Sequence, residues 1–218
     1  ASQTIFNFFL ATPMRVHQRH LDVYPLYHST AFGFSTLSML LGSTVVIADG
    51  FEPEGFVDML EEHRIHHTAL VPTMLHRVLS NVGADEIRAR NLSHLVAMFT
   101  GGAPLSAELA TRVLDAFGEV LFQFYGATET GLVTLASPKH LRDAPGTIGK
   151  VLGGNDVRLI DDAGKICGVD EVGELYVKSG NLVEGYHAND DATRDSMRDG
   201  YFSVGDLARC DARGYFFI

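Results

Sequence analysis

Residues 123–131 bring together side chains that can contact each part of a nucleotide. The apolar run Val120-Leu121-Phe122 leads into Gln-Phe-Tyr-Gly-Ala-Thr-Glu-Thr-Gly. The ring of Tyr125 can stack on a base, the hydroxyl of Thr128 can donate to a phosphate, and the carboxylate of Glu129 can bind Mg²⁺. The same pattern is also typical of a strand followed by a polar turn that binds nothing.

Two other stretches offer contacts of the same kind. Asp206 follows a glycine in Tyr-Phe-Ser-Val-Gly-Asp-Leu, where a carboxylate can accept bonds from both hydroxyls of a ribose. The alternative is a hairpin turn whose aspartate bonds its own backbone. Gly101 and Gly102 follow the apolar run Leu95–Phe99, and two glycines at a strand end let a flat ligand approach the main chain.

The first two-thirds of the chain alternate between apolar strands and amphipathic helices, which predicts an α/β fold. Expected helices cover 2–18, 53–63, 72–82 and 106–117, expected strands cover 44–48, 68–71, 95–100 and 120–124, and a strand and a helix share 23–41. Short connections of this kind produce a largely parallel sheet flanked by helices. Ligands bind at the carboxyl ends of such strands. Gly101-Gly102 and Tyr125–Glu129 both lie at such ends.

The helical pattern stops after about residue 140. Strands are expected at 156–160, 173–179 and 215–218, separated by turns rich in Asp and Gly. We therefore expect an α/β subdomain over residues 1–140 and a small, β-barrel-like subdomain over 141–218.

The composition excludes several classes of protein. A net charge of −10 argues against a nucleic-acid surface, which needs an excess of Lys and Arg. Cys167 and Cys210 show neither a disulfide framework nor zinc spacing, so a reducing cytoplasm is expected. The most apolar window, 31–48, is broken by Gly and Ser, so no transmembrane segment is predicted. No signal peptide is predicted from residues 1–30.

The motifs taken together resemble the adenylate-forming superfamily, which includes acyl-CoA synthetases, firefly luciferases and the adenylation domains of peptide synthetases. They occur in the order Pro25-x-x-His28, Gly101-Gly-Ala-Pro-Leu, Tyr125-Gly-Ala-Thr-Glu-Thr, Pro145-Gly-Thr-Ile-Gly, Gly173-Glu-Leu-Tyr-Val-Lys, Gly185-Tyr186 and Gly205-Asp206-Leu. Each motif is weak alone, and their order across nearly the whole chain carries the resemblance. The chain is most similar to the fatty acyl-CoA ligases and to the luciferase and coumarate-ligase branch.

The resemblance implies a role for each matched residue. The residues implied in nucleotide binding are Gly101, Gly102, Ala103, Pro104, Tyr125, Gly126, Thr128 and Asp206. Tyr125 would lie against the adenine, Asp206 would bind the ribose, Thr128 would bond the α-phosphate and Glu129 would hold Mg²⁺. His28 would act with Thr128 and Glu129 in catalysis, near the substrate carboxylate and the CoA channel. A satisfied core histidine is the alternative for His28.

The function implied is that of an acid–thiol ligase. ATP and a carboxylate, expected to be that of a fatty acid, give an acyl-adenylate, and coenzyme A then displaces AMP with Mg²⁺ as the metal cofactor. The family's phosphate-binding loop and its C-terminal domain with a catalytic lysine have no counterpart in the sequence. We therefore expect a piece of a larger enzyme that is inactive alone. Three alternatives stay open: a carrier-protein thiol as acceptor, an aryl acid, and a non-catalytic module that keeps only a ligand pocket.

Three local features depart from the pattern or compete with it. Ser29-Thr-Ala follows His28, where many relatives carry a glycine, and Val204 stands where the family has a hydroxyl. His63, His66 and His67 have spacings found in metal sites, but no third ligand position is indicated. We expect these histidines to lie at a helix end that faces solvent.

Overall fold

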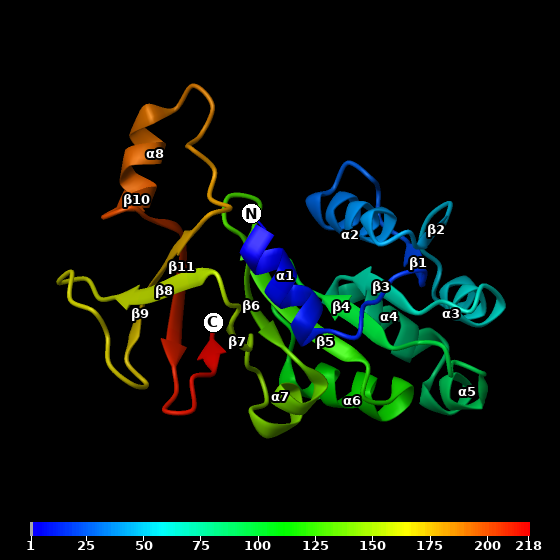
Figure 1. Cartoon of the computed structure of the whole chain (residues 1–218). Coiled ribbons are helices and arrows are strands. Elements are labelled where there is room, and N and C mark those ends of the chain that lie inside the picture. The colour runs from blue at the N-terminus through cyan, green and yellow to red at the C-terminus, as the bar shows by residue number, and fades with distance from the viewer. Residues whose placement is uncertain (1) are drawn as a thin grey trace.

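The structure, a computed structural model, describes residues 2–218 apart from the side chain of Ser2, and it contains two β-sheets (Figure 1). The first has seven strands in the order β2-β1-β3-β4-β5-β6-β7. These are β1 (Arg19–Asp22), β2 (Thr44–Ile47), β3 (His67–Leu70), β4 (Ala97–Thr100), β5 (Leu121–Ala127), β6 (Gly131–Ala136) and β7 (Lys150–Val151). Strands β1 to β5 pair in parallel and β6 and β7 add antiparallel, so the largely parallel sheet is confirmed.

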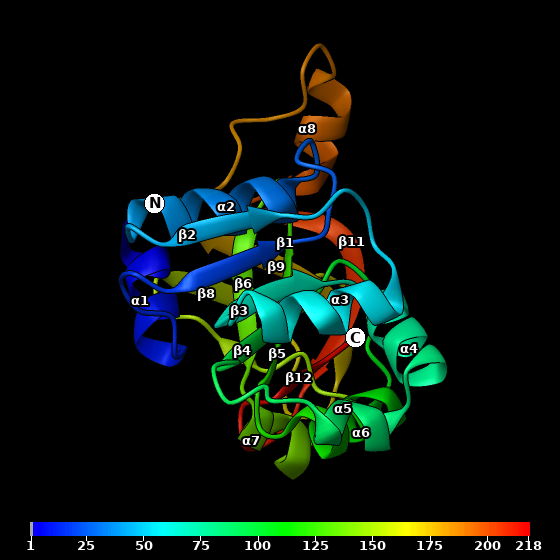
Figure 2. The ribbon, with the colours of Figure 1, turned by 90° about the vertical axis from the view of Figure 1, so that its right-hand side faces the viewer.

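Helices cover both faces of this sheet (Figures 1 and 2). Helices α1 (Ser2–Ala11) and α2 (Ser29–Leu40) lie on one face, where Phe8 and Phe34 pack with Phe99. The other face carries α3 (Pro53–Glu62), α4 (Pro72–Asn81), α5 (Ala84–Ala89) and α6 (Ala107–Phe117) over a larger aliphatic core. α7 (Pro138–Asp143) follows β6 and contacts α6.

Two helical predictions need correction. The first helix ends at Ala11 and not at residue 18, because Pro13 and the residue before it are poorly suited to a continuing helix. Helix α5 was not expected, since its six residues are too few to show a period. By contrast the helix expected over 106–117 is present as α6, where the Ser106 side chain caps the helix by accepting from the Leu109 N–H and Gly118 ends it.

The expected turn at residues 125–127 is instead the end of a longer strand. β5 continues through Ala127, and the chain reverses at Thr128–Thr130 before β6. The Ala127 N–H donates to the Thr130 hydroxyl at 3.0 Å, and the Thr130 N–H donates to the Ala127 carbonyl at 3.2 Å. Tyr125 is therefore held by a sheet, whereas Thr128 and Glu129 lie in the reversal.

The second sheet is antiparallel, with the order β10-β11-β9-β8 and β12 beside β11. Its strands are β8 (Asn155–Ile160), β9 (Val172–Ser179), β10 (Met197–Arg198), β11 (Tyr201–Cys210) and β12 (Phe216–Phe217), and α8 (Asp190–Ser196) stands beside β10. β11 and α8 were not predicted. β7 belongs to the first sheet, and the division at 140/141 stays a prediction.

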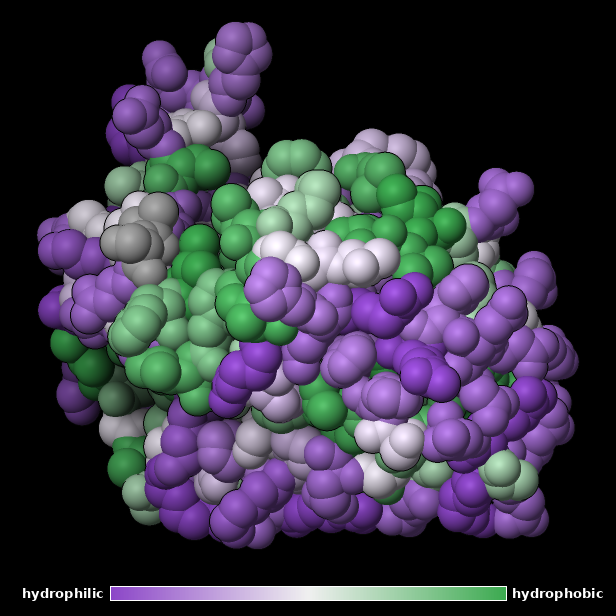
Figure 3. All heavy atoms as spheres, turned by 45° about the vertical axis from the view of Figure 1, so that its right-hand side comes forward, coloured by the Kyte–Doolittle hydropathy of each residue, from purple (hydrophilic) through white to green (hydrophobic). Residues whose placement is uncertain are grey.

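Hydrophobic surface gathers over α1 and α2 (Figure 3). The exposed large apolar side chains of these two helices are Ile5, Phe6, Leu10, Phe32, Met39 and Leu40. Within residues 2–218, no helix combines the length and the apolar character needed to cross a membrane.

Candidate functional site

Most of the predicted nucleotide-binding residues meet in one cavity at the carboxyl ends of β4 and β5, which we call the Tyr125 pocket. Its volume is about 250 Å³. It is lined by Gly102, Ala103, Pro104, Leu105, Gln123, Phe124, Tyr125, Gly126, Gly146, Ile148, Asp206 and Ile218. Six of the eight residues implied in nucleotide binding are among them, and Gly101 and Thr128 are not.

In the Tyr125 pocket, a side-chain hydrogen bond links the two sheets. The Tyr125 hydroxyl donates to the Asp206 carboxylate at 2.7 Å. The register between β9 and β11 shifts between Ser203 and Leu207, and such an irregularity turns a side chain toward a new direction. Burial, followed by the bond to Asp206, raises the pKa of Tyr125, so its ring is neutral and presents an aromatic face at ordinary pH.

Gln123 is a pocket residue that the sequence analysis did not single out. It lies inside β5, is 4% exposed, and lines the Tyr125 pocket. Its Oε1 atom is buried without a hydrogen-bond partner, as is the hydroxyl of Thr100, the residue beside it in register. A buried acceptor left unpaired in a pocket is suited to a ligand's N–H group. The signal was an amide side chain within an otherwise apolar strand.

Two glycines permit close packing beside the pocket. A Cβ on Gly101 would lie 2.5 Å from the ring of Phe124 and 2.7 Å from its carbonyl oxygen. A Cβ on Gly126 would lie 2.0 Å from the carbonyl oxygen of Gly131. Gly101 therefore keeps β4 close to β5 without lining the pocket, and Gly126 allows β6 to pair closely with β5.

A second cavity, the His28 pocket, adjoins the first and measures about 440 Å³. It is lined by His28, Ser29, Thr30, Gly33, Phe34, Leu37, Gly102, Phe124, Gly126, Ala127, Thr128, Gly131 and Leu132. Gly102, Phe124 and Gly126 line both cavities, so the two share a wall. The structure thus places Thr128 with His28, on the side away from Tyr125.

His28 is exposed and held at the start of α2, so it is not a core histidine. Its Nδ1 atom accepts from the Thr30 N–H at 3.2 Å, and its ring stacks on Tyr24 with centroids 5.5 Å apart. Because Nδ1 accepts, the neutral ring carries its proton on Nε2. Thr128 lies across from this helix start, 3.5 Å from the hydroxyl of Ser29.

Glu129 lies in the reversal after β5 and lines neither cavity. Its carboxylate accepts from the Tyr186 hydroxyl at 3.3 Å, and its carbonyl accepts from the Val183 N–H at 3.0 Å. Among the described residues, no group of three His, Cys, Asp or Glu side chains is placed to hold a metal. One carboxylate is still enough for Mg²⁺ when substrate phosphates and water supply the other ligands.

The histidine cluster at 63–67 does not face solvent as a unit, so that prediction was wrong for His67. His67 begins β3, is fully buried, and its Nδ1 lies 3.0 Å from Nδ1 of His20. Burial lowers the pKa of His20 to about 4 and that of His67 to about 3, so both are neutral near pH 7. They form a buried pair behind α2.

Comparison with known proteins agrees with this geometry. A family model described as AMP-binding enzyme matches residues 2–187. A feruloyl-CoA synthase from Amycolatopsis is 34% identical over 97% of this chain, and a luciferin 4-monooxygenase from Photinus pyralis is 36% identical over 91%. The o-succinylbenzoate coenzyme A synthetase of Bacillus subtilis, solved with AMP, superposes with a TM-score of 0.86 at 25% identity over 97% of the chain.

The chain spans less than half the length of these proteins: 43% of the feruloyl-CoA synthase, 36% of the luciferin 4-monooxygenase and 43% of the solved synthetase. The matches to the feruloyl-CoA synthase and to the solved synthetase nevertheless each cover 97% of this chain. The chain belongs to the AMP-binding enzyme family, the adenylate-forming superfamily of acyl- and aryl-CoA ligases that its motifs resemble.

Proposed function

We propose that this chain carries the acyl-adenylate site of an enzyme that joins a carboxylic acid to coenzyme A at the expense of ATP. The Tyr125 pocket would hold the adenosine, and the His28 pocket would hold the acid. The shared wall of Gly102, Phe124 and Gly126 would place the α-phosphate and the carboxylate next to each other. Holding two reactants in this way removes much of the entropic barrier to their reaction.

The charges of the two reactants oppose the reaction, and the site's donors would offset them. A carboxylate must approach an anionic phosphate, so donors aimed at the developing charge stabilise the transition state. The donors available in the His28 pocket are the Thr128 hydroxyl and the Nε2–H of His28. Glu129 would hold Mg²⁺, which supplies charge neutralisation at the phosphates when bound.

The observation that carries the proposal is the Tyr125 pocket itself, in which a ring and an amide with an unpaired oxygen from β5 face a carboxylate from β11. Tyr125 offers an aromatic face, Asp206 offers acceptors for two ribose hydroxyls, and Gln123 offers an unpaired acceptor. An adenine amino group is a donor that would satisfy Gln123, whereas the oxygen of hypoxanthine would not.

Calorimetric titration of this chain with AMP and with inosine monophosphate tests the proposal. We expect saturable binding of AMP and roughly 5- to 100-fold weaker binding of the inosine nucleotide, because an unmatched buried acceptor costs about 1–3 kcal/mol. Equal affinities would remove Gln123 from base recognition. No binding of AMP would contradict the nucleotide site.

The acceptor and the acid are the finer parts of the proposal. Coenzyme A is favoured because the most similar relatives include CoA synthases and ligases, and a carrier-protein thiol is the competing acceptor. The sequence resemblance favours a fatty acid, whereas the similar proteins also include feruloyl-CoA and coumarate enzymes. A reducing, cytoplasmic setting is also proposed, since Cys167 and Cys210 are free thiols.

A further inference from the structure

One face of α2 runs along the His28 pocket. Thr30, Gly33, Phe34 and Leu37 all line it, and these positions share a helix face. From Thr30 to Leu37 an α-helix rises about 10 Å. His28 and Thr128 lie at the Thr30 end, so a carboxyl group held there leaves roughly this length for the rest of an acid.

The floor of the pocket is a packed group of rings. Phe34 is 4% exposed, and its ring centroid lies 4.8 Å from that of Phe99 and 5.7 Å from that of Phe124. The imidazole of His20 stacks behind Phe34 at 6.3 Å. Rings fixed on several sides do not swing aside easily, so the pocket does not continue past Phe34 toward the sheet.

The space beside α2 is open at one position. A Cβ built on Gly33 would meet no atom within 4 Å, although this glycine is helical and lines the pocket. No Lys, Arg, Asp or Glu is among the lining residues. The polar lining residues His28, Ser29, Thr30 and Thr128 lie at its Thr30 end, and the pocket is roomy beside Gly33, with the rings of Phe34 and Phe124 in its lining.

We infer that the acid is compact and planar, an aryl or arylpropenoic acid whose ring lies on Phe34 and Phe124, and not a long-chain fatty acid. The inference rests on the proposed function, because it places the carboxyl group at His28 and Thr128. Flat rings pack well against other rings in offset or edge contacts, which favours an aromatic acid. A twelve-carbon chain in extended form is several ångströms longer than the space along α2.

Non-hydrolysable acyl-sulfamoyl adenosines test this inference on the chain as it stands. Calorimetric affinities are measured for AMP and for the cinnamoyl, octanoyl and dodecanoyl analogues. We expect the cinnamoyl analogue to bind at least tenfold more tightly than the dodecanoyl one, with the octanoyl analogue between them. Tightest binding of the dodecanoyl analogue would overturn the limit on length, and octanoyl binding as tight as cinnamoyl would overturn the preference for a planar ring.

Gly33→Leu gives the sharpest variant, since its side chain would occupy the space proposed for the ring. We expect at least a tenfold loss of affinity for the cinnamoyl analogue and unchanged affinity for AMP. Gly55→Leu is the matched control, because Gly55 is also helical with open space around a Cβ but lies in α3, outside the pocket. Unchanged cinnamoyl affinity in Gly33→Leu would contradict the inference.

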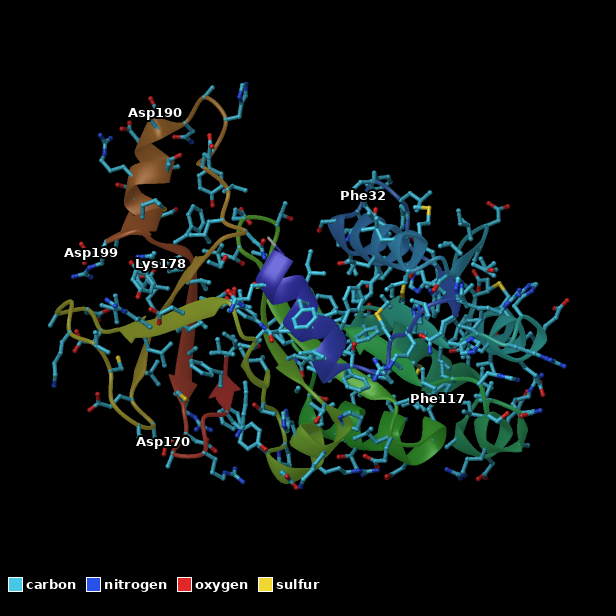
Figure 4. The ribbon with its side chains drawn as sticks, viewed as in Figure 1. Phe32, Phe117, Asp170, Lys178, Asp190 and Asp199 are labelled. Atoms are coloured by element: carbon cyan, nitrogen blue, oxygen red, sulfur yellow. The ribbon has the colours of Figure 1, made fainter. Side chains whose placement is uncertain are left out.

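A pair of phenylalanines on the same helix provides a second comparison. Phe34→Leu removes the ring from the floor, whereas Phe32 projects from the outer side of α2 and is 65% exposed (Figure 4). We expect Phe34→Leu to reduce the preference for cinnamoyl over octanoyl and Phe32→Leu to leave it unchanged. Equal effects would contradict the role of Phe34. If neither AMP nor any analogue binds the unmodified chain, the proposed function fails, and the inference with it.

Discussion

The two pockets on either side of Phe124 are built in different ways. The Tyr125 pocket is formed by strand ends and by glycines, with Gln123 and Tyr125 held by the first sheet and Asp206 by the second. The His28 pocket depends on which side chains one helix turns toward the sheet. The first arrangement leaves a readable motif and the second does not, which is why the nucleotide side could be predicted in more detail than the acid side.

The largest expected effect comes from the strand pair that both pockets share. Gly126→Ala places a methyl group 2.0 Å from the carbonyl oxygen of Gly131, so β5 and β6 must separate. We expect a fall of several kcal/mol in the free energy of unfolding, measured by urea denaturation, and loss of AMP binding. Gly33→Ala is the control, since its methyl group has open space. Near-normal stability of Gly126→Ala would show that the shared wall adapts.

Low pH should lower the free energy of unfolding through the buried histidine pair behind α2. The folded-state pKa values of about 4 for His20 and about 3 for His67 lie below the ordinary 6.5, so the unfolded chain binds more protons as the pH falls below 6.5. The free energy of unfolding is therefore full above pH 6.5 and falls toward pH 4, by about 1.4 kcal/mol per pH unit for each histidine. Denaturation at a series of pH values measures this slope.

Two variants identify the source of that slope. His67→Leu should reduce it by about half, because only His20 then contributes. The variant should still fold, since the Nδ1–H of His20 keeps the backbone carbonyl of residue 67 as its acceptor. His76→Gln, on the exposed side of α4, should leave the slope unchanged. An equal slope in His67→Leu and the unmodified chain would mean that other groups cause the loss of stability below pH 6.5.

The Asp206 carboxylate should contribute to nucleotide affinity and have little effect on binding of the acid in the His28 pocket. Asp206→Asn weakens bonds to the ribose hydroxyls, and hydrogen bonds to charged groups are worth about 1.5–3 kcal/mol. We expect a loss of AMP affinity of roughly 10- to 100-fold in calorimetry. Asp156→Asn is the matched control, because Asp156 also accepts from a tyrosine, Tyr201, but outside both pockets. Equal losses in both variants would indicate a general effect on the second sheet.

The smallest effect is expected for Tyr125→Phe. The ring that would lie against the adenine stays, and only the hydrogen bond to Asp206 is lost. We expect a loss of about fivefold in AMP affinity, the equivalent of roughly 1 kcal/mol. A loss as large as that of Asp206→Asn would mean that the hydroxyl positions the carboxylate completely.

The sequence predicted the α/β order because strands such as Ala97–Thr100 are uniformly buried and helices such as Ala107–Phe117 carry clear caps. It did not predict the strand Tyr201–Cys210, since Gly205 and Asp206 resemble a turn and the register shift is visible only once the partner strand is known. The Tyr125–Asp206 bond spans 81 positions, so no local pattern could show it. The His20–His67 pair was missed for the same reason.

The most direct test of the account is a crystal structure of this chain with the cinnamoyl-sulfamoyl adenosine. We predict adenine beside Tyr125 and Gln123, the ribose on Asp206, and the cinnamoyl ring across the shared wall against Phe34. A bound analogue with its base in the His28 pocket, or with its acyl group directed away from α2, would contradict the assignment of one pocket to the nucleotide and the other to the acid.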